Sequence, residues 1–281
     1  MSIITLNNLI KKRDKISFIL SGSKSISHRA LIINYLQNAS LVMKNLSNSD
    51  DTRVLKKALS LSSELIDLKE SGTAMRFLLS LFAFKKNNIT LIGHDYLLQR
   101  PISELIYALN KLGAYIECDS NRIIINNNIE FTTNKLDLNS NKTSQYISSL
   151  LLIAPYFPKG LELSFNPNIY SKTYIDMTVS MMKNCGAVLS ISKNKINISP
   201  VKYTRCISII ESDWTSLSYL LEAFLFSSLN IIDVTSLYQN SIQGDRIVLD
   251  FFALFGVSAV FENDTLLLRK IKNFTFPKKI E

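Results

Sequence analysis

Three similar segments recur along the 281-residue chain at nearly constant intervals, and they constrain its fold more than any other feature. They are LNKLGAYIECDSNRIIIN, MKNCGAVLSISKNKINIS and FALFGVSAVFENDTLLLRK. Each begins as the end of an apolar-periodic helix, passes through a glycine, and continues as two short strands joined by a polar turn. Gly113, Gly186 and Gly256 are spaced 73 and 70 residues apart, and each is predicted to end its helix in the left-handed conformation.

A helix that opens with hydroxyl residues precedes each of these glycines. The openings are SGTAMRFLLSLF, KTSQYISSLLLIA and DWTSLSYLLEAFLF, and their marker residues Thr73, Thr143 and Thr215 lie 40, 43 and 41 residues before the glycines. The spacing predicts a unit of about 70 residues in the order helix, strand, helix, strand, strand. A shorter unit opens at KSISHRALIINYL, and its second helix, DDTRVLKKAL, runs on to SELIDL without a glycine hairpin. Such repeats imply an α/β domain whose strands and buried helices close around a pseudo-axis.

The helix openings also predict an anion site. A helix N-terminus leaves N–H groups unpaired and carries partial positive charge, and small hydroxyl residues let an anion approach the backbone. Cations at or near these openings are Lys24, Arg29, Arg76, Arg100 and Lys142. Pro101 is expected at the first position of a helix. If the repeats pack around an axis, the openings converge on a pocket for a substrate with more than one anionic group.

Other polar residues favour structural interpretations. DWTSLSYLL carries no cation, so we expect an ordinary cap with Trp214 packed in a core. Asp50 and Asp51 indicate a helix cap and a first-turn acid. His28 and His94 are isolated, His94 is expected in a loop, and the chain has no G-x-S-x-G, G-x-x-x-x-G-K-[ST] or G-x-G-x-x-G motif.

Composition narrows the class of protein. The net charge of +9 fits an anionic partner, or codon drift toward lysine, and no Lys/Arg tract interleaves with aromatic residues, so nucleic-acid binding is not predicted. Cys118, Cys185 and Cys206 are too far apart for a disulfide framework or a metal site, which indicates a reducing, cytoplasmic compartment. Neither a secretory signal nor an apolar run of about 20 residues is found, so no membrane association is expected.

At these motifs the sequence resembles the EPSP synthases, the 3-phosphoshikimate 1-carboxyvinyltransferases. SGSKSISHRALI is similar to the family signature P-G-S-K-S-x-S-N-R-A-L, and SGTAMRFL to G-T-A-M-R. Five further segments follow in family order: QRPISELIYALNKLGA, TSQYISSLLLIAP, SKTYIDMTVSMMKNCGA, ESDWTSLSYLL and NSIQGD. Four positions depart from the pattern: Ser21 and Phe77 replace proline, His28 replaces asparagine and Thr143 replaces serine.

The resemblance implies a two-domain α/β fold built from α-β-α-β-β units around a pseudo-threefold axis. Residues 21–210 would form a complete domain of three repeats. Residues 1–20 and 211–281 would supply one repeat of three of a second domain, which is therefore expected to be incomplete. The family's general-base aspartate, a glutamate, and further lysine and arginine ligands would belong to two repeats without a counterpart in these 281 residues.

The resemblance also implies an activity and a set of binding residues. Members transfer the enolpyruvyl group of phosphoenolpyruvate to the 5-hydroxyl of shikimate 3-phosphate and release phosphate, on the pathway to chorismate and aromatic amino acids, with no metal or organic cofactor. By motif, shikimate 3-phosphate would contact Lys24, Ser25, Arg29, Thr143, Ser144, Gln145, Ser171 and Tyr174. Phosphoenolpyruvate would contact Lys24, Gly72, Arg100 and Gln145.

Several functions stay open at this point. One hypothesis is an enzyme completed by a complementing C-terminal fragment. The alternative is a non-catalytic truncated remnant that at most binds shikimate 3-phosphate. A sister transferase acting on a nucleotide sugar fits GSKSISHRA and GTAMR less well. A basic nucleic-acid binder would instead show steeply salt-dependent affinity for DNA or RNA.

Overall fold

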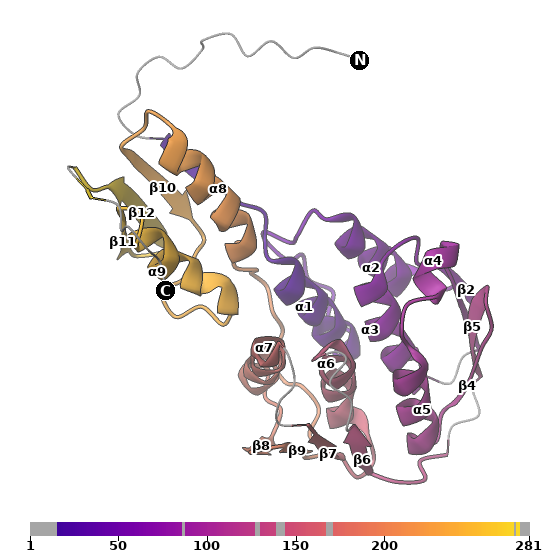
Figure 1. Ribbon diagram of the computed structural model, residues 1–281. Helices are drawn as coiled ribbons and strands as arrows, with labels where there is room; N and C mark the ends of the chain where they lie inside the picture. Colours follow the sequence, from indigo (N-terminus) through magenta and orange to yellow (C-terminus); the bar gives the residue numbers. More distant parts are fainter. Residues whose placement is uncertain are drawn as a thin grey trace, which may run out of the picture. The chain divides into compact units, whose positions relative to one another are not determined.

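The structure is a computed structural model that describes residues 16–85, 88–126, 130–138, 144–166, 171–272 and 274–275. The chain divides into two compact units, each a mixed α/β structure (Figure 1). Unit 1 contains Met1–Ser21 and Glu211–Glu281, and unit 2 contains Gly22–Ile210.

One four-stranded sheet topology occurs three times in the described chain. The orders are β2-β3-β5-β4 and β6-β7-β9-β8 in unit 2, and β1-β10-β12-β11 in unit 1. In each sheet the first two strands are parallel, and the last two form an antiparallel hairpin. The unit 2 strands are β2 (Leu65–Asp67), β3 (Ile89–Ile92), β4 (Tyr115–Cys118), β5 (Arg122–Asn126), β6 (Lys135–Leu138), β7 (Leu161–Phe165), β8 (Leu189–Ser192) and β9 (Lys195–Ile198). Those of unit 1 are β1 (Ile16–Ile19), β10 (Ile231–Thr235), β11 (Val257–Glu262) and β12 (Thr265–Lys270).

The helices fall into the predicted order around these strands. Unit 2 contains α1 (Lys24–Leu36), α2 (Asp50–Ser60), α3 (Gly72–Phe82), α4 (Asp95–Leu98), α5 (Ser103–Leu112), α6 (Ser144–Ile153) and α7 (Lys172–Asn184). Unit 1 contains α8 (Trp214–Phe226) and α9 (Val248–Ala253). The order helix, strand, helix, strand, strand is therefore confirmed from α3, from α6 and from α8, with the short α4 as an addition before α5.

The three repeat glycines have the predicted conformation. Gly113, Gly186 and Gly256 have φ of 111°, 97° and 78°, in the left-handed region where a side chain is strained. A Cβ at Gly113 would lie 1.7 Å from the carbonyl oxygen of Glu130. The turn from helix into hairpin therefore requires glycine at this point of the repeat.

The short repeat that opens at α1, in unit 2, does not build a sheet of its own. Lys44 forms an isolated parallel bridge with Ile209, and after α2 the chain enters β2, the first strand of the next sheet. The expected absence of a glycine hairpin after α2 is confirmed. Gly22 also matters here, because its Cβ would lie 1.7 Å from the carbonyl oxygen of Asn45.

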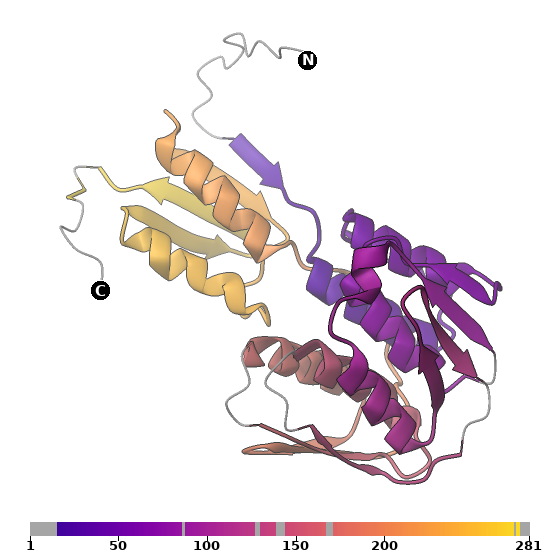
Figure 2. The ribbon, with the colours of Figure 1, turned by 45° about the vertical axis from the view of Figure 1, so that its right-hand side comes forward.

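The core of unit 2 is built from helices that lie between its two sheets (Figures 1 and 2). Nine consecutive residues of α1, from Ile26 to Asn34, are buried, and α3 and α6 are buried over almost their whole lengths. Small side chains let these helices approach closely, as where the Ser80 hydroxyl on α3 donates to Ser149 on α6 at 2.8 Å. Because these helices are enclosed, they bury polar side chains such as Ser27, Ser80 and Ser149 together with their apolar residues.

In unit 1, α8 and α9 lie on one face of the sheet (Figure 2). Trp214 is fully buried, and Asp213 caps α8 by accepting from the Ser216 amide at 2.8 Å, so the expected ordinary cap with a packed tryptophan is confirmed. Among the described residues, no helix is long and apolar enough to cross a bilayer.

The expectation for Pro101 is wrong. Helix α5 begins at Ser103, and Pro101 lies outside it. Its carbonyl oxygen accepts from the Tyr146 hydroxyl and from Arg76. These tertiary contacts engage the Pro101 carbonyl outside the helix, and α5 starts two residues later than local preference indicates.

Replacing Gly113 with alanine should destabilise unit 2, because the left-handed backbone and the Glu130 carbonyl both oppose a Cβ. We expect Gly113→Ala to lower the free energy of unfolding by roughly 1–3 kcal/mol, measured by urea denaturation followed by circular dichroism. Asn38 also has positive φ, at 54°, so the control Asn38→Gly should change it by only a few tenths of a kcal/mol. Equal stability of Gly113→Ala and the unaltered chain would contradict this account.

Candidate functional site

The first turn of α1 places a lysine beside a carboxylate from α2. Lys24 Nζ lies 3.0 Å from Asp51 Oδ2, and both side chains are partly exposed. Burial raises the pKa of Asp51, but hydrogen bonds from Ser71 and Lys24 outweigh it and hold the pKa below its usual value. Asp51 is a first-turn acid, as expected, while Ser49 is the cap residue of α2. The sequence did not predict the ion pair between Asp51 and Lys24.

Arg29 is a buried cation that joins three helices. Its Nε donates to Thr178 Oγ1 at 2.7 Å, and one terminal nitrogen donates to Ser148 Oγ and the Tyr174 carbonyl, both at 3.1 Å. The other terminal nitrogen donates to the Ser25 carbonyl at 2.8 Å. Burial lowers the pKa of Arg29 to about 10, against an opposing effect of Tyr174, so the group stays charged at neutral pH. No carboxylate in the described part of the chain forms an ion pair with it, which leaves uncompensated positive charge.

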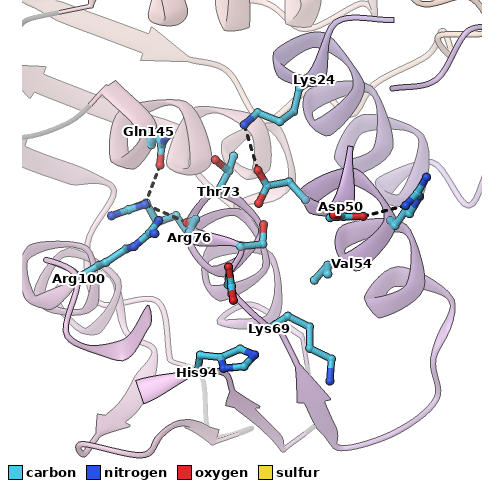
Figure 3. Close-up of a pocket in the computed structure, with 14 residues that line it drawn as sticks. Lys24, Asp50, Val54, Lys69, Thr73, Arg76, His94, Arg100 and Gln145 are labelled. Atoms are coloured by element: carbon cyan, nitrogen blue, oxygen red, sulfur yellow. Dashed lines mark hydrogen bonds and ion pairs between the residues drawn. The ribbon is translucent and has the colours of Figure 1, made fainter. Parts of the chain in front are cut away.

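The start of α3 brings two more guanidinium groups together. Ser71 caps this helix by accepting from the Ala74 amide at 3.2 Å. A Cβ at Gly72 would lie 2.6 Å from a terminal nitrogen of Arg100 and 3.0 Å from one of Arg76. Figure 3 shows the Arg76 and Arg100 side chains next to each other, with Arg76 hydrogen-bonded at 2.9 Å to Gln145 Oε1. Because Gly72 has no Cβ, both guanidinium groups can lie close to the backbone at the start of α3.

These side chains surround two neighbouring cavities of about 820 and 300 Å³ that share Lys24, Thr73 and Gln145. The larger cavity is also lined by Asp50, Asp51, Arg53, Val54, Lys69, Glu70, Ser71, Gly72, Arg76, His94 and Arg100 (Figure 3). The smaller is also lined by Ser25, His28, Arg29, Phe77, Ser144, Ser171 and Tyr174.

Charge in the larger cavity is unevenly paired. Lys24, Arg53 and Lys69 each have a carboxylate partner. Within the described ranges, Arg76 and Arg100 form no ion pair with an acid. The side of the cavity lined by Arg76 and Arg100 therefore suits an anion, because two adjacent guanidinium groups can bind a phosphate or a carboxylate.

The structure groups most of the sequence-predicted binding residues. Lys24, Ser25, Arg29, Ser144, Gln145, Ser171 and Tyr174 line the smaller cavity, and Lys24, Gly72, Arg100 and Gln145 line the larger. Ser171 has φ of 63° and precedes α7. Lys142 and Thr143 lie outside the described residues.

Sequence reasoning left other lining residues out of the binding set. Arg76 and Thr73 lie in the G-T-A-M-R motif itself, which was the available signal. His94, expected in a loop, precedes α4 directly and lines the larger cavity. In the described part of the chain, no group of three or more His, Cys, Asp or Glu residues could hold a metal ion.

Comparison with known proteins identifies the family. The family model described as EPSP synthase (3-phosphoshikimate 1-carboxyvinyltransferase) matches residues 57–278. The chain belongs to the EPSP synthase family. A 3-phosphoshikimate 1-carboxyvinyltransferase of Bacteroides fragilis is 38% identical over 260 residues, which are 91% of this chain and 63% of that protein. One of Buchnera aphidicola subsp. Cinara cedri is 30% identical over 290 residues, covering 90% and 65%.

The chain thus spans a little under two thirds of the length of these curated EPSP synthase relatives. The EPSP synthase structure from Acinetobacter baumannii superposes with a TM-score of 0.70 at 17% identity, covering 94% of this chain and 67% of that one. This likeness confirms the predicted fold class, a mixed α/β fold of the EPSP synthase type.

The buried histidine of this site should make stability depend on pH. Burial lowers the pKa of His28 from 6.5 to about 3, so between these pH values the unfolded chain binds a proton that the folded chain does not. The free energy of unfolding should therefore fall by about 1.4 kcal/mol per pH unit as the pH drops below 6.5.

Urea titrations at pH 4 to 7 check this expectation. Carboxylates also titrate in this range, so the pH dependence of the free energy of unfolding is compared between the unaltered chain and His28→Gln. The variant should lose the part of that dependence that comes from His28. The exposed His94 provides the control, since His94→Gln should keep the pH dependence that comes from His28. Identical pH profiles for all three proteins would refute the assignment.

Proposed function

We propose that this protein takes part in the transfer of the enolpyruvyl group of phosphoenolpyruvate to the 5-hydroxyl of shikimate 3-phosphate, with release of phosphate. The observation that carries the proposal is the convergence of four helix starts, those of α1, α3, α6 and α7, on two adjoining cavities with unpaired cations. Both substrates are multiply anionic, and the curated relatives carry the name of this activity. With three free cysteines in the described chain, we place the reaction in the cytoplasm.

The smaller cavity suits shikimate 3-phosphate. Arg29 and Ser25 can hold a carboxylate or phosphate, and the hydroxyls of Ser144, Ser171 and Tyr174 can donate to the remaining oxygens. By the family motif Thr143 belongs to the same set. Because Arg29 is held by four hydrogen bonds, it would meet the ligand in a preformed position.

The larger cavity suits phosphoenolpyruvate. Lys24, Arg100 and the backbone at Gly72 can neutralise its phosphate and carboxylate, while Gln145 lies between the two cavities. In the reaction the 5-hydroxyl loses its proton as its oxygen bonds to C2 of phosphoenolpyruvate, and the bond from C2 to the phosphate oxygen breaks, so that the net products are the enolpyruvyl ether and hydrogen phosphate. The cations would stabilise the negative charge on the departing phosphate.

Unit 1 supports the proposal of a complementing segment. Exposed apolar residues follow one stripe of α8, where Tyr219 and Phe226 are 71% and 83% exposed. Ile247, Phe251 and Leu254 form a second stripe at α9. In unit 2 the equivalent helices α3 and α6 bury this face against each other. Further repeats of the same topology, which the greater length of the relatives can supply, would cover the stripes.

Binding and turnover can be tested separately. Calorimetry should show that the protein binds shikimate 3-phosphate and that Lys24→Ala weakens binding roughly 10- to 100-fold, because a charged hydrogen bond is lost. Lys56 lies exposed on α2 outside both cavities, so Lys56→Ala should bind normally. Equal affinity of Lys24→Ala and the unaltered chain would refute the site.

Phosphate release then decides between the enzyme and the binding-only alternative. The assay combines the protein with the part of the Bacteroides fragilis relative that lies beyond the matched 63%. Release that depends on both components supports a complemented enzyme. Binding of shikimate 3-phosphate without release under any combination supports the non-catalytic alternative.

A further inference from the structure

His28 lines the smaller cavity, yet its side chain is fully buried. It lies on the first turns of α1, four residues after Lys24 and directly before Arg29. Its ring meets that of Phe77 edge-on, with 6.3 Å between the centroids. Phe77 also lines the cavity and carries the Arg29 guanidinium 5.6 Å above its own ring. The imidazole is therefore held in one place beside the buried cation.

The two ring nitrogens of His28 differ in their partners. Nε2 lies 3.1 Å from Thr52 Oγ1, which is 2.9 Å from Ser49 Oγ at the start of α2. Nδ1 is buried, and it has no hydrogen-bond partner among the described residues. Buried polar atoms in folded proteins are almost always paired, so an unpaired one in a cavity wall indicates a missing partner.

The charge state of His28 restricts what that partner is. Burial is the main cause that lowers its pKa to about 3; Asp51 opposes this shift and Lys24 and Arg29 contribute to it, so the ring is neutral at neutral pH. A neutral imidazole has one donor and one acceptor nitrogen. The Thr52 hydroxyl can fill either role at Nε2, and Nδ1 can therefore be donor or acceptor. A ligand hydroxyl matches both cases, whereas a carboxylate or phosphate only accepts.

We propose that His28 is a ligand-binding residue of the smaller cavity, whose Nδ1 hydrogen-bonds an uncharged hydroxyl group of the bound molecule. Arg29 and the serine hydroxyls bind the anionic groups of that molecule, and His28 hydrogen-bonds a hydroxyl on the carbon ring that carries them. The inference rests on the proposed function, in which that molecule is shikimate 3-phosphate.

Nuclear magnetic resonance can observe this nitrogen directly, because the chain contains only two histidines. In protein labelled with ¹⁵N-histidine, His94→Gln assigns the two sets of signals. Saturation with shikimate 3-phosphate should shift the Nδ1 resonance of His28 at neutral pH. An analogue that lacks one ring hydroxyl, either the 4- or the 5-hydroxyl, should bind without that shift.

Affinities provide an independent measurement. His28→Leu should weaken binding of shikimate 3-phosphate about two- to twelve-fold, and should leave the affinity for the matching deoxy analogue unchanged. Thr52→Val is the matched control, because it removes the partner of Nε2 and keeps Nδ1. If His28 only holds α2 in place, Thr52→Val will reproduce the effect of His28→Leu, and the inference is wrong.

The outcomes separate the inference from the proposed function. Saturable binding with no change at Nδ1 overturns the role of His28 and leaves the proposed substrate intact. No binding of shikimate 3-phosphate overturns both. The labelled, unaltered chain decides the matter even if His28→Leu fails to fold.

Discussion

The candidate binding site depends on the hydrogen bonds of one buried guanidinium group. Arg29 on α1 reaches hydroxyl and carbonyl groups on α6 and α7, so the three helix starts are held around a single positive charge. All four partners are neutral oxygen atoms rather than carboxylates. The charge is therefore solvated by the protein without being cancelled, and it remains available to an anion in the cavity.

This arrangement is possible because the helices of unit 2 are buried together. Serines on α3 and α6 allow close approach, and the outer sheets cover the apolar helices that result. In unit 2, the starts of α1, α3 and α6 each carry small hydroxyl residues. Once the helices pack side by side, these starts become walls of the same cavities.

The repeat could be predicted from local sequence alone. A helix end and a hairpin are predicted at Gly113, Gly186 and Gly256 from local sequence alone, since the left-handed conformation is a local requirement. Pro101 was predicted wrongly for the complementary reason. Its carbonyl is held by Arg76 and Tyr146, which are remote in the chain, and this overrides the local preference for a helix start.

The sequence by itself determined the repeat, the family signature and the helix starts that carry Lys24, Gly72 and Ser144, because each is written in consecutive residues. Only the tertiary structure decided the pairing of Lys24 with Asp51, the contact of Arg76 with Gln145, and the orphaned nitrogen of His28. These features join residues from different helices. Their charges and hydrogen bonds exist only once packing has excluded water and brought the side chains within about 3 Å of each other.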